Sequence, residues 1–168
     1  GEDLGETIEK RIGEVLRKRG WTLSVAESCT GGQICDRITN VPGSSEYFLG
    51  GVVTYSNESK RRQLGVPKKE IERFGAVSPQ VAKRMAIGVR KRFDATFGLS
   101  TTGIAGPSGG TPEKPVGLVY IGLTKGRRVS VVKFNLKGSR KRIKRESTHL
   151  ALRSLFQFIK ETPQKDKR

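Results

Sequence analysis

The sequence predicts an α/β fold, a three-layer α/β/α sandwich whose mixed sheet includes an antiparallel hairpin. Segments with helical spacing alternate with short apolar strands through the first hundred residues. This alternation is typical of a sheet with helices on both faces. Two later strands, 116–124 and 128–136, flank Lys125-Gly126, which is a hairpin signal. The length of 168 residues indicates one domain, which we place at 1–161, with 162–168 as a frayed tail.

Helices are predicted where apolar residues recur every three or four positions between a cap and a stop. Ser78-Pro79 shows this well, because serine is a good N-cap, proline suits the first helical position, and Met85 lies on the apolar stripe that follows. The other helices are expected over 4–19, after Gly32, over 57–64 with Ser56-Asn57 as the cap, after Pro67, and from about Ser139 to Phe158.

Strands are predicted over 21–26, 50–55 and 95–101, and the segments that border them are the first candidates for a functional site. The loop 103–115 is rich in glycine and proline and longer than most connections, which is typical of functional loops. Ligands of open α/β sheets bind at the carboxyl ends of strands. We therefore expect the segments 27–32 and 43–51 to meet this loop on one side of the sheet.

The charge is strongly basic and unevenly distributed. Lys and Arg outnumber Asp and Glu by 33 to 16, and residues 125–168 carry +12 of the net +17. The densest stretch, 137–145, could bind phosphate on a nucleic acid or on a small nucleotide. It could also be a solvated helix face, since no aromatic side chains are interleaved to stack on bases. Charge alone does not decide between one bound phosphate and many.

Cysteine and histidine content excludes several classes of protein. Cys29 and Cys35 are the only cysteines and His149 is the only histidine. These numbers exclude zinc fingers, Cys/His metal clusters and disulfide scaffolds, so we expect no metal and no cofactor. Both cysteines are expected to be small core residues. No run of 18 apolar residues and no export signal is present, so we expect a cytoplasmic protein without a membrane partner.

Thr30-Gly31-Gly32 opens a predicted helix directly after a strand. Free backbone N–H groups and the positive end of the helix dipole would make this turn a phosphate site. Glycines are equally expected at any tight strand-to-helix turn. Neither a Walker A nor a G-x-G-x-x-G pattern is present, which argues against ATP-driven and dinucleotide redox chemistry.

Several ordered motifs closely resemble the CinA C-terminal domain family. They run from the first helix to the last: AESCTGG at 26–32, PGSS at 42–45, GVVTYSNESK at 51–60, GAVS at 75–78, TGIAGP at 102–107 and KPVG at 114–117. The resemblance implies an α/β/α sandwich that self-associates. It also implies an amidohydrolase that converts nicotinamide mononucleotide (NMN) to nicotinate mononucleotide and ammonia. In many members an N-terminal molybdopterin-binding-like domain precedes this one, and a chain that begins with Gly1 could come from such a longer parent.

The resemblance also implies roles for individual residues. Ser45 matches the nucleophile, Lys60 the base, Tyr55 a neighbour of both, and Thr102 a further active-site position. Arg140 matches an arginine suited to clamping the substrate phosphate. We expect further substrate contacts from four positions of the turn and one of the long loop, namely Ser28, Thr30, Gly31, Gly32 and Gly103.

Among mechanisms of amide hydrolysis, the composition also favours a serine paired with a lysine. The single histidine lies late in the chain, which makes a Ser-His-Asp triad improbable. Lys60 must then lose its proton to act as a base, which requires burial or neighbouring cations such as Arg61, Arg62 or Arg140. Ser44 or Ser28 could be the nucleophile instead of Ser45. Two other functions stay open: a basic nucleic-acid-binding module, and a catalytically silent domain that binds a nucleotide.

Overall fold

The structure is a computed structural model that describes residues 6–164. Leu4, the predicted start of the first helix, and residues 165–168 of the predicted tail lie outside the described residues. The described part forms a five-stranded sheet with the strand order β2-β1-β3-β4-β5. Its strands are β1 (Leu23–Glu27), β2 (Phe48–Val53), β3 (Phe97–Gly103), β4 (Leu118–Lys125) and β5 (Arg128–Asn135).

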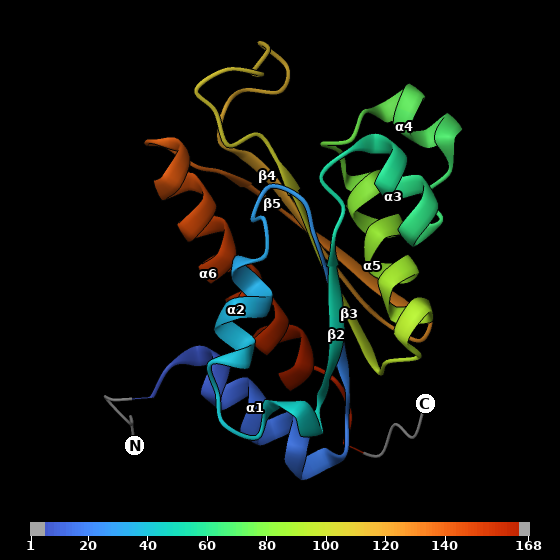
Figure 1. Cartoon of the computed structure of the whole chain (residues 1–168), viewed down its shortest axis with the longest axis vertical. Helices are drawn as coiled ribbons and strands as arrows, with labels where there is room; N and C mark the ends of the chain where they lie inside the picture. Colours follow the sequence, from blue (N-terminus) through green and yellow to red (C-terminus); the bar gives the residue numbers. More distant parts are fainter. Residues whose placement is uncertain (1–5, 165–168) are drawn as a thin grey trace.

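The sheet is mixed, as predicted. β1 pairs in parallel with both β2 and β3, whereas β4 pairs antiparallel with β3 and with β5. Gly126 turns the β4–β5 hairpin with a positive φ of 59°. The carboxyl ends of β1, β2 and β3 therefore lie at one end of the sheet, where the polypeptide leaves the strands towards α2, α3 and the long loop (Figure 1).

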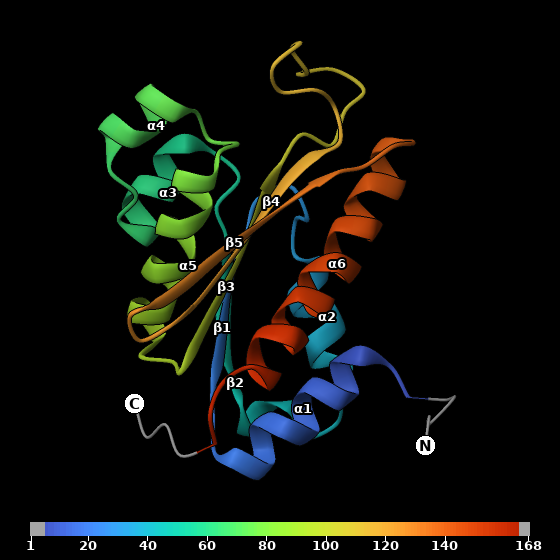
Figure 2. The ribbon, with the colours of Figure 1, turned by 180° about the vertical axis from the view of Figure 1, so that it is seen from behind.

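Helices cover both faces of the sheet and make the predicted three layers (Figures 1 and 2). One face carries α1 (Ile8–Arg19), α2 (Gln33–Thr39) and α6 (Arg140–Lys160). The other carries α3 (Asn57–Leu64), α4 (Lys68–Phe74) and α5 (Pro79–Phe93). A short 3-10 helix, η1 (Ser44–Glu46), precedes β2 at the far end of the sheet from α3.

Serine caps fix where three helices begin, as the sequence indicated. The Ser56, Ser78 and Ser139 side chains each accept a hydrogen bond from a backbone N–H in the first turn of α3, α5 and α6. Met85 on α5 is completely buried, in a cluster between this helix and the sheet. Of the two cysteines, Cys29 is buried and Cys35 is only partly so.

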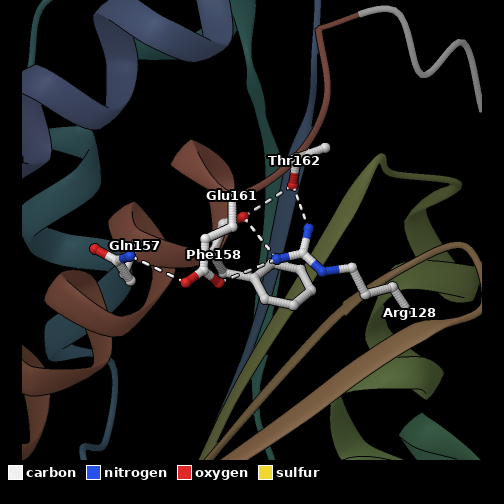
Figure 3. A network of polar contacts seen from close by, with 5 residues as sticks. All are labelled: Arg128, Gln157, Phe158, Glu161 and Thr162. Carbon is white, nitrogen blue, oxygen red and sulfur yellow. Dashed lines mark hydrogen bonds and ion pairs between the residues drawn. The ribbon is translucent and has the colours of Figure 1, made fainter.

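The predicted frayed tail is wrong at its first residue. Thr162 is buried, donates to the Phe158 carbonyl oxygen over 2.8 Å and accepts a bond from Arg128 at the start of β5 (Figure 3). The Arg128 guanidinium also lies 3.8 Å from the centroid of the Phe158 ring, a cation–π contact. This network holds the end of α6 against the hairpin, so ordered structure extends past residue 161.

Candidate functional site

A buried lysine and a buried serine meet at the carboxyl ends of the parallel strands. Lys60 Nζ lies 2.9 Å from Ser28 Oγ and donates a second bond over 2.7 Å to the Thr54 carbonyl oxygen. Only 1% of Lys60 and 8% of Ser28 are exposed. The two residues are 32 positions apart in the sequence. The parallel pairing of β1 with β2 brings them together, because Ser28 follows β1 and Thr54 follows β2.

Local structure explains why Lys60 turns inward. Ser56 and Ser59 form a capping box that starts α3 just after β2. Lys60 then lies on the first turn of the helix, on the same side as Leu64, which packs into the core below. Because the helix begins so close to the strand end, the lysine chain spans the gap from α3 to β1.

Burial gives this amine the property that a general base needs. It lowers the pKa of Lys60 from 10.5 to about 8, because desolvation disfavours the ammonium form. Neighbouring arginines, which the sequence offered as a second cause, are not among the causes of this shift. A sizeable fraction of Lys60 is therefore neutral near physiological pH and can accept a proton from Ser28.

The serine–lysine pair opens into a cleft of about 200 Å³. The residues that line this cleft come from the ends of β1, β2 and β3, from the start of α3, from the segment after α4, from the long loop and from α6. They include Cys29, Asn57, Ala76, Thr102, Gly103, Gly106, Ser108 and Arg140. Of the predicted site residues, Ser28, Tyr55, Lys60, Thr102, Gly103 and Arg140 thus meet at one place.

Arg140 closes the mouth of the cleft. Its guanidinium donates to the Gly106 carbonyl oxygen and to the Tyr55 hydroxyl, each over 2.7 Å. Tyr55 is 61% exposed, so Arg140 and Tyr55 lie at the rim of the cleft and not in its floor. A guanidinium in this place can hold an anionic group of a ligand whose other end reaches Ser28.

Thr102 and Lys114 tie the two walls of the cleft together. The Thr102 hydroxyl donates over 2.8 Å to the Ala76 carbonyl oxygen, and Lys114 donates over 2.5 Å to that of Phe74. Through the hydrogen bond that its hydroxyl donates, Thr102 therefore holds the segment after α4 in place. This assigns Thr102 a positioning role within the described residues.

The predicted phosphate site at Thr30-Gly31-Gly32 is wrong, because the protein's own carboxylate occupies it. Glu27 is fully buried, and its Oε1 accepts bonds from Thr30 Oγ1, Gly32 N and Ile34 N over 2.6, 3.0 and 3.1 Å. Its Oε2 accepts a bond from Cys35 N over 2.9 Å. This carboxylate satisfies the donors at the start of α2 and compensates the helix dipole, so that turn has no place for a second anion.

The predicted pairing of Ser45 with Lys60 is not formed within the chain. Ser45 lies in η1, before β2, and Lys60 lies after it. The six residues of β2 separate the two ends by roughly 20 Å at about 3.3 Å per residue. For the same reason the segment 43–51 does not join 27–32 and the long loop. Ser44, the other alternative, is buried in η1 at the same distant end. Ser28, the remaining alternative, is the serine that Lys60 contacts.

Two features of the cleft were missed in the sequence. The first is the Thr54 carbonyl oxygen, which accepts the second hydrogen bond of Lys60. A backbone acceptor cannot be recognised from the residue type, and only the position of Thr54 directly after β2 marks it as a strand end. The Cys29 thiol lines the cleft beside Ser28, and burial raises its pKa to about 12, so it stays protonated.

Elsewhere in the described residues no side-chain arrangement indicates a particular chemistry as the cleft does. A larger groove of about 690 Å³ lies between α1, α6 and β5, with apolar and basic side chains and no serine–lysine pair like that of the cleft. Over residues 6–164 no group of three His, Cys, Asp or Glu side chains is placed to bind a metal ion. None of the described helices has the length and apolar content that crossing a membrane requires.

Together, the fold and the cleft define a class: α/β/α sandwich domains with a buried serine–lysine pair at the carboxyl ends of a parallel strand pair. The chain belongs to the CinA C-terminal domain family, whose model matches residues 5–159. This confirms the family that the motifs indicated.

Similar proteins agree with this family assignment. A competence-damage inducible protein of Halothermothrix orenii is 53% identical over 95% of this chain, and a CinA-like protein of Dictyoglomus thermophilum is 52% identical over 88% of it. The solved structure of the competence/damage inducible protein CihA from Agrobacterium tumefaciens is 38% identical, with a TM-score of 0.85 over 92% of this chain and 94% of that one. The chain spans 39% of the length of the Halothermothrix relative and 36% of the Dictyoglomus one.

Proposed function

We propose that this domain is an amidohydrolase that converts NMN to nicotinate mononucleotide and ammonia, with Ser28 as the nucleophile and Lys60 as its base. The observation that carries the proposal is the 2.9 Å contact between Ser28 Oγ and a lysine amine that is almost fully buried. A serine hydroxyl is a weak nucleophile until an adjacent base takes its proton. A buried lysine of lowered pKa is such a base.

In the proposed reaction, neutral Lys60 takes the Ser28 proton while Oγ attacks the carboxamide carbon. The tetrahedral intermediate then expels the amide nitrogen, which leaves as ammonia with the proton from Lys60. The resulting Ser28 ester is hydrolysed by one water, which releases the carboxylate product and restores the hydroxyl. Each proton taken up by Lys60 is returned, so the enzyme ends in its starting state.

The oxyanion of the tetrahedral intermediate needs a donor beside the nucleophile. The backbone N–H of Cys29 directly follows Ser28, and among the described hydrogen bonds it has no acceptor. We assign the oxyanion contact to this N–H. An N–H from the residue after a nucleophile fills the same role in other serine hydrolases.

Arg140 fits the other end of the substrate. The mononucleotide phosphate carries the negative charge, and Arg140 is the guanidinium that lines the cleft. Because the cleft holds only about 200 Å³, the proposal places the pyridine carboxamide inside and the ribose phosphate at the rim beside Tyr55 and Arg140.

The direct test is ammonia release from NMN by the purified domain, with the product identified by mass. We expect turnover by the wild type, and none above background from Ser28→Ala or Lys60→Met at unchanged helical content. Ser45→Ala serves as the matched serine control, and its kcat should stay close to the wild-type value. A folded wild-type domain that releases no ammonia would refute the proposed activity, and full activity of Ser28→Ala would refute the nucleophile.

A further inference from the structure

The outermost strand β5 is left partly uncovered on the α6 side of the sheet. α6 packs on β3 and β4, whose residues are nearly all buried, whereas no residue of β5 is fully buried. Ser130, Val132 and Phe134 of β5 line the groove of about 690 Å³ between β5, α6 and α1. Leu150 and Phe156 of α6 add to its apolar lining and pack against the core. The groove therefore exposes apolar surface that a partner could cover.

β5 is also the last strand of the sheet, and no described strand lies on its outer side (Figure 2). The Leu136 N–H, one residue past β5, donates to the Gly117 carbonyl oxygen just before β4. Successive residues of a strand direct their backbone groups to opposite sides. The N–H and C=O groups of Val129, Val131 and Lys133 therefore point away from β4. Such a row of unpaired backbone groups is a template for another strand.

Three cations without a partner surround the groove. Arg11, Arg153 and Lys160 line it, and none of them forms an ion pair within residues 6–164. Phe156 holds two of them, because Arg11 Cζ and Lys160 Nζ lie 4.9 and 5.3 Å from the centroid of its ring. The positive charges are thus placed beside the apolar surface before any partner binds.

Glu161 is the one carboxylate among the described residues that line the groove, and it does not neutralise these cations. Its oxygens accept hydrogen bonds from Arg128 over 3.4 Å and from Gln157 over 3.0 Å (Figure 3). Arg128 is in turn bonded to the end of α6, so β5 directs no free charge into the groove. Inward charges of that kind are what protects many sheet edges from pairing. The groove therefore suits a negatively charged occupant that extends the sheet.

We propose that an acidic, extended segment of another protein pairs with the outer edge of β5 and places its side chains in this groove. A strand at this edge lies about 4.8 Å from β5. Its alternate side chains then stand beside Val132 and Phe134, where apolar groups cover the exposed surface. Carboxylates between them meet the three cations. Backbone pairing supplies affinity and the alternate side chains supply specificity, as in other complexes formed by strand addition.

A second copy of this chain fits the groove poorly. Pairing of β5 with itself would bring the same unpaired cations, together with Lys133, to both sides of the contact, in a chain that already carries +17. Like charges across an interface oppose association. The charge of the groove thus favours an acidic partner over self-pairing.

The groove is separate from the cleft that contains Ser28 and Lys60. α6 begins at the cleft with Arg140, whereas it lines the groove from Leu150 to Glu161. At 1.5 Å per residue these parts of the helix lie roughly 15–30 Å apart. No described residue lines both, so this proposal does not depend on the activity proposed above.

Binding is tested with a capped peptide of the length of β5, eight residues, with the sequence Thr-Val-Thr-Glu-Thr-Val-Thr-Glu. A matched peptide carries lysine in place of each glutamate. We expect the labelled acidic peptide to saturate the domain in fluorescence polarisation, and the lysine peptide to bind at least tenfold more weakly. Equal binding of the two peptides, or no saturation by the acidic one up to about 1 mM, would overturn the proposal.

Charge reversal on the protein tests whether the groove itself attracts the peptide. Arg153→Glu/Lys160→Glu changes two exposed residues of α6 that line the groove and should weaken binding of the acidic peptide tenfold or more. Lys141→Glu/Arg145→Glu makes the same change in net charge at exposed positions of α6 outside the groove, and should keep most of the affinity. An equal loss in both variants would show attraction by net charge alone and would refute the site.

Hydrogen exchange tests the strand pairing. At saturating peptide the N–H groups of Val129, Val131 and Lys133 should exchange at least tenfold more slowly, whereas that of Val132, directed towards β4, should change little. Unchanged exchange at these three positions would show a peptide that does not extend the sheet, contrary to the proposal. Slow exchange there without peptide, in a domain that sediments as a dimer, would show that a second copy already covers β5, and would overturn the choice of partner.

Discussion

The burial of Lys60 predicts an unusual pH dependence of folding stability. In the folded protein its pKa is lowered from 10.5 to about 8. Between these two pH values the unfolded chain binds more protons at this position than the folded one, so the free energy of unfolding rises with pH there. The cost of keeping a buried ammonium is fully present below about pH 8 and disappears as pH approaches the unfolded pKa of 10.5.

Lys60→Met isolates this cost, because methionine has similar length and no charge. The two pKa values give a penalty of roughly 3 kcal/mol at pH 7, and most of it, about 2–3 kcal/mol, is relieved by pH 10. The variant also loses the bonds to Ser28 and Thr54, and any dependence of those bonds on the proton is already contained in the folded pKa. The change with pH therefore reports the titration of this one amine.

The assay is urea unfolding followed by circular dichroism at several pH values between 7 and 10. We expect the free energy of unfolding of the wild type to rise by about 2–3 kcal/mol relative to that of Lys60→Met across that range. Lys141→Met, which removes an exposed lysine of α6, should change the difference little. Parallel pH curves for the wild type and Lys60→Met would show that the amine is solvated, and would refute both its burial and its use as a base.

Further predictions follow from the same contacts. The kcat/KM for NMN should rise with pH and level off above about pH 8, as Lys60 loses its proton; a flat profile from pH 6 to about 9 would contradict its role as the base. The Glu27 carboxylate accepts four hydrogen bonds, and Glu27→Gln replaces one of its oxygens with an NH2 group that faces the Cys35 N–H and cannot accept from it. The free energy of unfolding in urea should fall by roughly 3 kcal/mol or more. Gly13→Ala places a Cβ 2.2 Å from Tyr47 Oη and should lower the free energy of unfolding by about 1–3 kcal/mol. Part of this loss should be recovered in Gly13→Ala/Tyr47→Phe. An unchanged free energy of unfolding would contradict the prediction and show that α1 moves freely away from Tyr47. Arg140→Ala should raise the KM for NMN tenfold or more with a smaller change in kcat. For the wild-type domain, a steep loss of affinity for DNA between low and physiological salt would favour the nucleic-acid-binding alternative.

Local patterns in the sequence determined most of the secondary structure. Serine caps, glycine stops and apolar stripes act over three or four residues, so Ser56, Ser78 and Ser139 could be recognised as helix starts from their neighbours alone. The hairpin at Gly126 is local for the same reason. The three-layer arrangement followed from the order of these elements.

Tertiary structure alone decided which serine meets Lys60. Ser28 and Ser45 both precede it in the chain, and no local rule separates them. The choice depends on strand order and direction: β1 and β2 run in parallel, so the residue after β1 meets the residues after β2, and the one before β2 is carried to the other end of the sheet. The Thr30-Gly31-Gly32 turn has the sequence of an anion site, yet the buried Glu27 carboxylate fills it. Contacts between distant segments, and the burial that shifts the pKa of Lys60, arise only when the sheet has formed.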